Sequence, residues 1–196
     1  MQFSDRMKDY EEGIFQVLDE MKVKKEQSGE KVYNFSVGTP DFKPARHIMD
    51  AVTEAASQPE NYKYALKDMP ALLEAVKDRY HKRYHVEVET DEITSLYGSQ
   101  EGFAHIAFAL CNPGDIFLVP NPGYPVFTFG PSLAGVKIVT YDLIEEIGYL
   151  PDLSAIDEET ARAAKCIVVS YPLNPVCKCA PPSFYEDLIA CAKKYD

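Results

Sequence analysis

Four short apolar runs in the second half of the chain alternate with segments of helical pattern, and this alternation strongly constrains the fold. The runs cover residues 93–97, 116–119, 136–141 and 164–170. Segments with helix-like apolar spacing follow them at residues 101–111, 126–134 and 181–194. Alternating strands and helices of this length imply right-handed βαβ crossovers. We therefore predict an α/β fold with a largely parallel mixed sheet flanked by helices.

The first ninety residues have a different pattern, dominated by helical segments and loops. Apolar residues at helical spacing predict helices within residues 5–25, 44–55 and 70–80. We expect an N-terminal helical arm and small-domain segment over residues 1–45, and a partial large domain over residues 46–196. The last predicted helix is a crossover without a following strand, so we expect the sheet of this chain to be incomplete.

Composition limits the classes of function. The chain has 20 Lys plus Arg against 31 Asp plus Glu, a net charge of −11 that disfavours binding to nucleic acid. No apolar run reaches the ~18 residues of a membrane span. Five cysteines without a signal-peptide core predict free thiols and a cytoplasmic location. Cys177 and Cys179 lack the spacing of a zinc site, so we expect no metal there.

Three of the predicted strands lead into short motifs that could hold a ligand. The motifs are YGSQEG at residues 97–102, PNPGYP at 120–125 and SYPLNP at 170–175. Open α/β sheets bind ligands at the carboxyl ends of their strands. The first motif could offer backbone amides at a helix N-terminus to an anion, the second an aromatic face and the third an amide side chain. A phosphate, a flat ring and a polar ring substituent would suit this combination.

Each motif also has an ordinary structural interpretation. Ser99 could be a helix N-cap, which is a common role for serine. Tyr124 could cover the edge of the core with its apolar body and keep its hydroxyl in water. Asn174 precedes a proline and could be a turn asparagine. The case for a ligand site therefore depends on the three motifs as a set.

As a set, and in this order, the motifs resemble the cofactor pocket of the class I/II aminotransferases. These are fold-type-I enzymes that use pyridoxal 5′-phosphate (PLP). Further similar stretches are NFSVGTPDF at residues 34–42, YKYALKDMPALLEA at 62–75 and NPGDIFLVPNPGY at 112–124. The resemblance extends from about residue 30 to the end of the chain. The chain departs from the family at Val176-Cys177, where Thr-Gly is usual, and at Asp68, where glycine is common.

The resemblance implies roles for individual residues of the large domain. Ser99, Gln100 and Glu101 would surround the PLP phosphate through backbone and side-chain groups. Tyr124 would stack on the pyridine ring. Asn174 would donate a hydrogen bond to the phenolic oxygen of the ring.

The resemblance also implies roles near the N-terminus and at a subunit interface. Gly38 would approach the α-carboxylate of the substrate. Tyr64, or Tyr62, would reach the cofactor phosphate of the neighbouring subunit in a homodimer. No lysine of the chain matches the family's cofactor-binding lysine, so the catalytic residue is unassigned.

The function implied is amino-group transfer between an amino acid and a 2-oxo acid, represented here by the N-terminal half of the enzyme and inactive by itself. Another fold-type-I PLP enzyme, such as a carbon–sulfur lyase, is an alternative. So is a non-catalytic, truncated remnant that binds phosphate or a partner. A nucleotide-binding Rossmann domain has less support, because the chain has neither Gly-x-Gly-x-x-Gly after its first strand nor a Gly-Lys-Ser/Thr loop.

Overall fold

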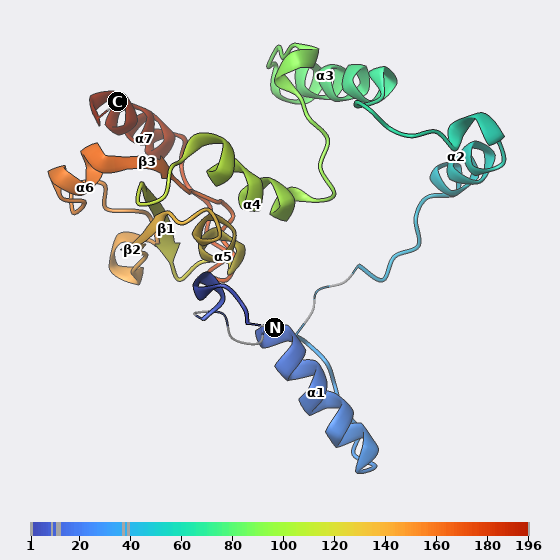
Figure 1. Cartoon of the computed structure of the whole chain (residues 1–196), viewed down its shortest axis with the longest axis horizontal. Helices are drawn as coiled ribbons and strands as arrows, with labels where there is room; N and C mark the ends of the chain where they lie inside the picture. The colour runs from blue at the N-terminus through green and yellow to red at the C-terminus, as the bar shows by residue number, and fades with distance from the viewer. Residues whose placement is uncertain (1, 9, 11–12, 37, 39, 196) are drawn as a thin grey trace. The chain divides into compact units, whose positions relative to one another are not determined.

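A computed structural model of the chain describes residues 2–8, 10, 13–36, 38 and 40–195 (Figure 1). Its internal contacts divide it into two compact units, Met1–Thr94 and Ser95–Asp196. The domain boundary predicted near residue 45 stays a prediction. Two residues of the stretch at 34–42, Val37 and Thr39, lie outside the described residues.

The first unit consists of helices joined by loops, as the apolar spacing predicts. Its α-helices are α1 (Ile14–Gln27), α2 (Arg46–Ala56) and α3 (Pro70–Tyr84). Short 3-10 turns are η1 (Asp5–Met7), η2 (Pro59–Asn61) and η3 (Thr90–Glu92). Proline suits the first position of α3, where its missing N–H has no intrahelical partner to lose. Among the described residues of α1, α2 and α3, none is buried.

The second unit contains a three-stranded sheet in which all strands are parallel. The strands are β1 (Ile116–Asn121), β2 (Lys137–Asp142) and β3 (Ala164–Ile167), in the spatial order β2-β1-β3. Leu118 of β1 lies opposite Val139 of β2 and Ile167 of β3. The sheet confirms the predicted α/β class.

Four helices of the second unit accompany the sheet: α4 (Ser99–Leu110), α5 (Val126–Ser132), α6 (Glu158–Ala163) and α7 (Pro182–Tyr195). A 3-10 turn, η4 (Glu145–Ile147), lies between β2 and α6. The predicted strand at residues 93–97 was wrong, because the described residues there form no strand. A strand exists only through hydrogen bonds to a neighbour, and the described sheet contains β1, β2 and β3 alone.

Side chains of β1 alternate between two apolar clusters, one on each face of the sheet. Phe117 and Val119 are buried in the cluster that includes Ala107 of α4 and Phe127 of α5. Leu118 is buried in the other cluster. The two faces together make β1 the centre of the core, with Phe117 only 2% exposed and Val119 fully buried.

Helix length and the grouping of polar side chains bear on membranes and metals. Within the residues that the structure describes, no helix is long and apolar enough to cross a membrane. The same residues contain no group of three or more His, Cys, Asp or Glu side chains that could hold a metal ion.

Candidate functional site

The first motif forms the beginning of helix α4. Gly98 is the residue before the helix and has φ of 93°, a left-handed conformation that glycine adopts without steric cost. Ser99 is the first helical residue, and the N–H of Glu101 donates to the carbonyl of Gly98 at 3.2 Å. The first turn of an α-helix leaves N–H groups without intrahelical acceptors, and the helix dipole favours an anion there. The start of α4 therefore has the chemistry of an anion site.

The second motif is joined to the first by a side-chain hydrogen bond. The amide Nε2 of Gln100 donates to the hydroxyl of Tyr124 at 3.1 Å. The Tyr124 ring is half-buried and lies edge-on to Phe127, with 6.2 Å between the ring centres. Both contacts restrict the orientation of the ring. The predicted anion-binding and ring-binding elements thus lie next to each other.

The turn that presents Tyr124 requires a glycine. A Cβ atom on Gly123 would lie 2.5 Å from the carbonyl oxygen of Pro120, which is closer than non-bonded atoms approach. Gly123 thus lets the backbone turn sharply after β1.

The third motif follows β3, the strand next to β1. Leu173 is 1% exposed and anchors the turn in the core, whereas Asn174 is exposed. Cys177 has φ of 54°, and its N–H donates to the carbonyl of Leu173. Among the described residues, no hydrogen bond joins Asn174 to Gln100 or Tyr124. The relation of the third motif to the second therefore rests on the adjacency of β3 and β1.

The two remaining predicted residues lie in the first unit. Tyr64 is 89% exposed, in the loop before α3. The alternative residue, Tyr62, donates its hydroxyl to the carbonyl of Ala56 at 2.7 Å. Gly38 is described, but both of its neighbours lie outside the described residues. Of the two tyrosines, Tyr62 is therefore the one whose hydroxyl makes a contact within its own unit.

A buried tyrosine links β2 to the residue that follows β3. The Tyr141 hydroxyl donates to the carbonyl of Val168 at 2.5 Å. Burial, together with the neighbouring Tyr171, raises the pKa of Tyr141. Beside it, the amide of Asn121 donates to the carboxylate of Asp142 at 2.8 Å, joining the ends of β1 and β2. We did not anticipate either contact, although the polar residues that end both strands were a usable signal.

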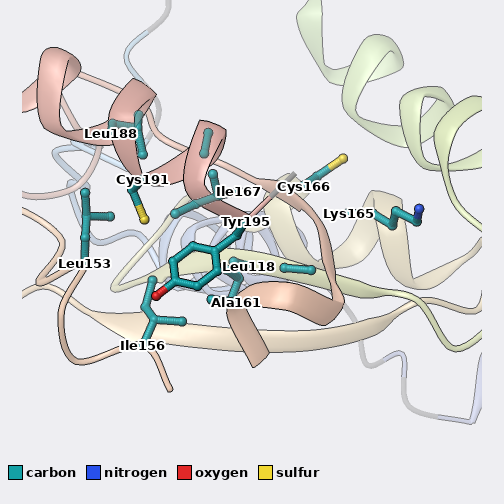
Figure 2. A pocket seen from close by; sticks show the side chains of 12 residues that line it. Leu118, Leu153, Ile156, Ala161, Lys165, Cys166, Ile167, Leu188, Cys191 and Tyr195 are labelled. Carbon is teal, nitrogen blue, oxygen red and sulfur yellow. The ribbon is translucent and has the colours of Figure 1, made fainter. Parts of the chain in front are cut away.

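Two cavities of the second unit do not fit the predicted ligand. The first has a volume of about 180 Å³ and lies between β3, α6 and α7 (Figure 2). It is smaller than the ~300–1,000 Å³ of typical small-molecule sites. Figure 2 shows the Tyr195 ring among apolar side chains, including Leu188 and Ile156. None of the predicted site residues is among the described residues that line it.

The second cavity borders β2 and contains the carboxyl groups of Asp142, Asp152 and Asp157. Hydrogen bonds from Ser154 lower the pKa of Asp152. Hydrogen bonds from Thr160 lower the pKa of Asp157. Both carboxyl groups therefore remain charged at neutral pH and would repel a phosphate. The start of α4, next to Tyr124, fits a phosphorylated aromatic ligand better than either cavity.

Comparison with known proteins shows which proteins this chain resembles. The family model for class I and II aminotransferases matches residues 30–196. The chain is 42% identical to an LL-diaminopimelate aminotransferase of Halothermothrix orenii, covering 100% of this chain and 51% of that protein. A second LL-diaminopimelate aminotransferase, from Aquifex aeolicus, is 40% identical with the same coverage. The chain thus spans about half the length of these relatives.

Solved structures are also similar to this chain over about half of their length. Substrate-bound BacF from Bacillus subtilis superposes with a TM-score of 0.92 at 33% identity, over 100% of this chain and 50% of that protein. A Thermus thermophilus aspartate aminotransferase, at 23% identity, shares the fold with a TM-score of 0.91 over 100% of this chain and 51% of that protein. The family match over residues 30–196 shows that the chain belongs to the class I and II aminotransferases, a family of PLP-dependent enzymes.

Proposed function

We propose that this chain forms the N-terminal half of a PLP-dependent aminotransferase site. The observation that carries the proposal is the hydrogen bond between Gln100 and Tyr124. It connects an anion-binding helix start to an aromatic ring that is available for stacking. A compound that is both phosphorylated and aromatic would use both elements at once.

Each predicted residue then has a separate task. The backbone N–H groups of Ser99 and Gln100 would hold the phosphate, with the Ser99 hydroxyl as a further donor. Tyr124 would stack on the ring, and Asn174 would donate to the ring's phenolic oxygen. When bound, PLP would supply the electron sink for amino-group transfer. Gly38 would leave room for the α-carboxylate of an amino acid.

The proposed substrates are an amino acid and a 2-oxo acid. Two relatives at 42% and 40% identity are named LL-diaminopimelate aminotransferases, so LL-diaminopimelate is the first amino donor to test. The assay uses the native polypeptide that carries this sequence, with a 2-oxo acid as acceptor. Transamination would support the proposal, whereas elimination of the substrate side chain would indicate a lyase.

We also propose a homodimer in which Tyr64 contacts the phosphate of the other subunit. Support comes from the 89% exposure of Tyr64 and from the local hydrogen bond that occupies Tyr62. In a dimer that works this way, Tyr64→Phe weakens phosphate binding and Tyr62→Phe does not. The two variants are compared by the concentration of PLP that half-saturates the native protein. The cytoplasmic location expected from the sequence stays a proposal as well.

The cofactor proposal is tested with pyridoxine 5′-phosphate, which lacks the aldehyde of PLP. Surface lysines therefore cannot capture it covalently, and equilibrium dialysis measures binding to the site alone. Tyr124→Ala should weaken binding about tenfold through the lost stacking. Tyr33→Ala removes an exposed tyrosine of the other unit and serves as the matched control. Equal affinity of the two variants would contradict the proposal.

A further inference from the structure

The carboxylate of Glu101 points back across the start of its own helix. Its Oε2 accepts a hydrogen bond from the backbone N–H of Tyr97 at 2.7 Å. Its Oε1 lies 3.9 Å from Nδ1 of His105, one turn further along α4. Both carboxylate oxygens therefore face groups of this chain.

This contact resembles a helix-capping interaction. In a capping box, the side chain at the third helical position accepts a hydrogen bond from the N–H of the residue before the helix. Glu101 holds that third position in α4, but it reaches one residue further, to Tyr97. The hydrogen bond closes a loop around Gly98, whose φ of 93° has few restraints of its own. Glu101 thereby fixes the direction in which the chain enters α4.

The charge of Glu101 argues against direct contact with a phosphate. A carboxylate only accepts hydrogen bonds, as does a fully ionised phosphate, and two anions repel. Any benefit of Glu101 to an anion site must therefore come through the backbone that it holds. That backbone includes the N–H groups of Ser99 and Gln100, which directly follow the fixed turn.

We propose that Glu101 is a positioning residue, which orders the Tyr97–Gly98 turn so that the following N–H groups converge on the phosphate. The inference rests on the proposed function for its ligand. It assigns the side chain a task that differs from contact with the cofactor. The Glu101 carboxylate acts on the site only through Tyr97.

Two substitutions separate the hydrogen bond from the charge. Glu101→Gln and Glu101→Ala both remove the charge, but only glutamine keeps an oxygen that can accept from Tyr97. We expect Glu101→Gln to bind pyridoxine 5′-phosphate about fivefold more tightly than Glu101→Ala, the factor of a typical capping interaction. Relative to wild type, Glu101→Gln should bind equally well or more tightly, because a repulsive charge is gone. His105→Gln, which leaves the Tyr97 contact intact, is the control.

A second measurement needs no ligand. Amide hydrogen exchange at Tyr97, read by NMR on the native polypeptide that carries this sequence, should be slow in wild type and Glu101→Gln and faster in Glu101→Ala. If the wild-type chain shows this protection but does not bind the probe, the cofactor proposal fails and the ordering of the turn stands. If glutamine and alanine variants exchange and bind alike, the positioning role is wrong. Loss of binding in both variants, with protection kept in Glu101→Gln, would instead show that the charge itself is required.

Discussion

Helices of the two units have similar apolar patterns but very different surroundings. In α2 of the first unit, Ile48 and Val52 are 51% and 64% exposed. In the second unit, Ala107 of α4 and Phe127 of α5 are buried against the sheet. The periodicity of apolar residues is sufficient to form a helix in both units. Burial, however, requires a second surface, which the sheet and the paired helices α4 and α5 provide in the second unit. Substitutions can therefore test whether stability is concentrated in the second unit.

Phe117→Ala should have the largest effect. Phe117 is 2% exposed at the centre of the core, and such truncations cost about 3–5 kcal/mol of unfolding free energy. Ile48→Ala in α2 should cost about 0.5 kcal/mol or less, because surface positions contribute little. Urea denaturation followed by circular dichroism compares the two variants. Similar losses of unfolding free energy in the two variants would show that stability is not concentrated in the second unit.

Gly130→Ala tests the close approach of α4 and α5. A Cβ atom at Gly130 would lie 2.9 Å from Cα of Ala104, and backbone atoms cannot yield as a flexible side chain does. Overpacking of this kind costs about 1–3 kcal/mol. Gly13→Ala, where the added atom meets nothing within 4 Å, should cost below about 1 kcal/mol in the first unit. The comparison uses the same denaturation assay, and equal costs would show that the helices can separate freely.

Tyr141→Phe should destabilise the sheet by about 1–2 kcal/mol, because the buried carbonyl of Val168 loses its donor. The matched change in the first unit is Tyr62→Phe, which removes an equivalent hydrogen bond at a position that is 75% exposed. Water can replace that donor, so its cost should be near zero. Thermal melting of both variants gives the comparison. A larger loss of stability in Tyr62→Phe than in Tyr141→Phe would contradict the prediction.

The same tyrosine makes stability depend on pH. Burial raises the pKa of Tyr141 in the folded chain, whereas the unfolded tyrosine ionises near pH 10. The stabilising contribution is therefore complete below about pH 10 and declines as the pH rises above it. Tyr141→Phe should lose part of this alkaline sensitivity. Denaturation midpoints at pH 8 and pH 10.5 test the prediction, with Tyr62→Phe as the control.

The smallest effect on stability is expected at residues whose own backbone conformation is strained. Cys177 in the second unit and His85 at the end of α3 both have left-handed φ, at 54° and 56°. Replacing either by glycine should stabilise the chain by about 0.5–1 kcal/mol, because glycine adopts this conformation without a Cβ clash. The gain should be similar in both units, unlike the effects of core substitutions. A gain at one position only would show that the surroundings decide the strain.

The fold was predictable where local signals and tertiary partners agree. The runs at residues 116–119, 136–141 and 164–170 overlap β1, β2 and β3, and the helices appear near their predicted positions. The run at 93–97 also contains apolar residues but is not a strand of the described sheet. Composition shows that a segment can become a strand. Only the presence of a hydrogen-bonding partner makes it one.

The local geometry of the motifs was predictable, but the contacts between them were not. The turns at Gly98 and Gly123 can be predicted from the sequence, because glycine is the residue that fits them. Gly98 has a positive φ, and a Cβ atom on Gly123 would clash with the carbonyl of Pro120. The hydrogen bond between Gln100 and Tyr124 depends on how α4 lies against the turn after β1. The Glu101 contact depends on the exact side-chain rotamer as well. Such details follow from packing, which no local pattern encodes.

The central place of β1 has a consequence for the energetics of ligand capture. A strand that is hydrogen-bonded on both sides is among the last parts of a domain to open. Tyr124 follows this strand by three residues and is held by Gln100 and Phe127. The Tyr124 ring therefore loses little conformational entropy when a flat molecule stacks on it. A ligand that stacked on Tyr124 would therefore lose little of its affinity to ordering the ring.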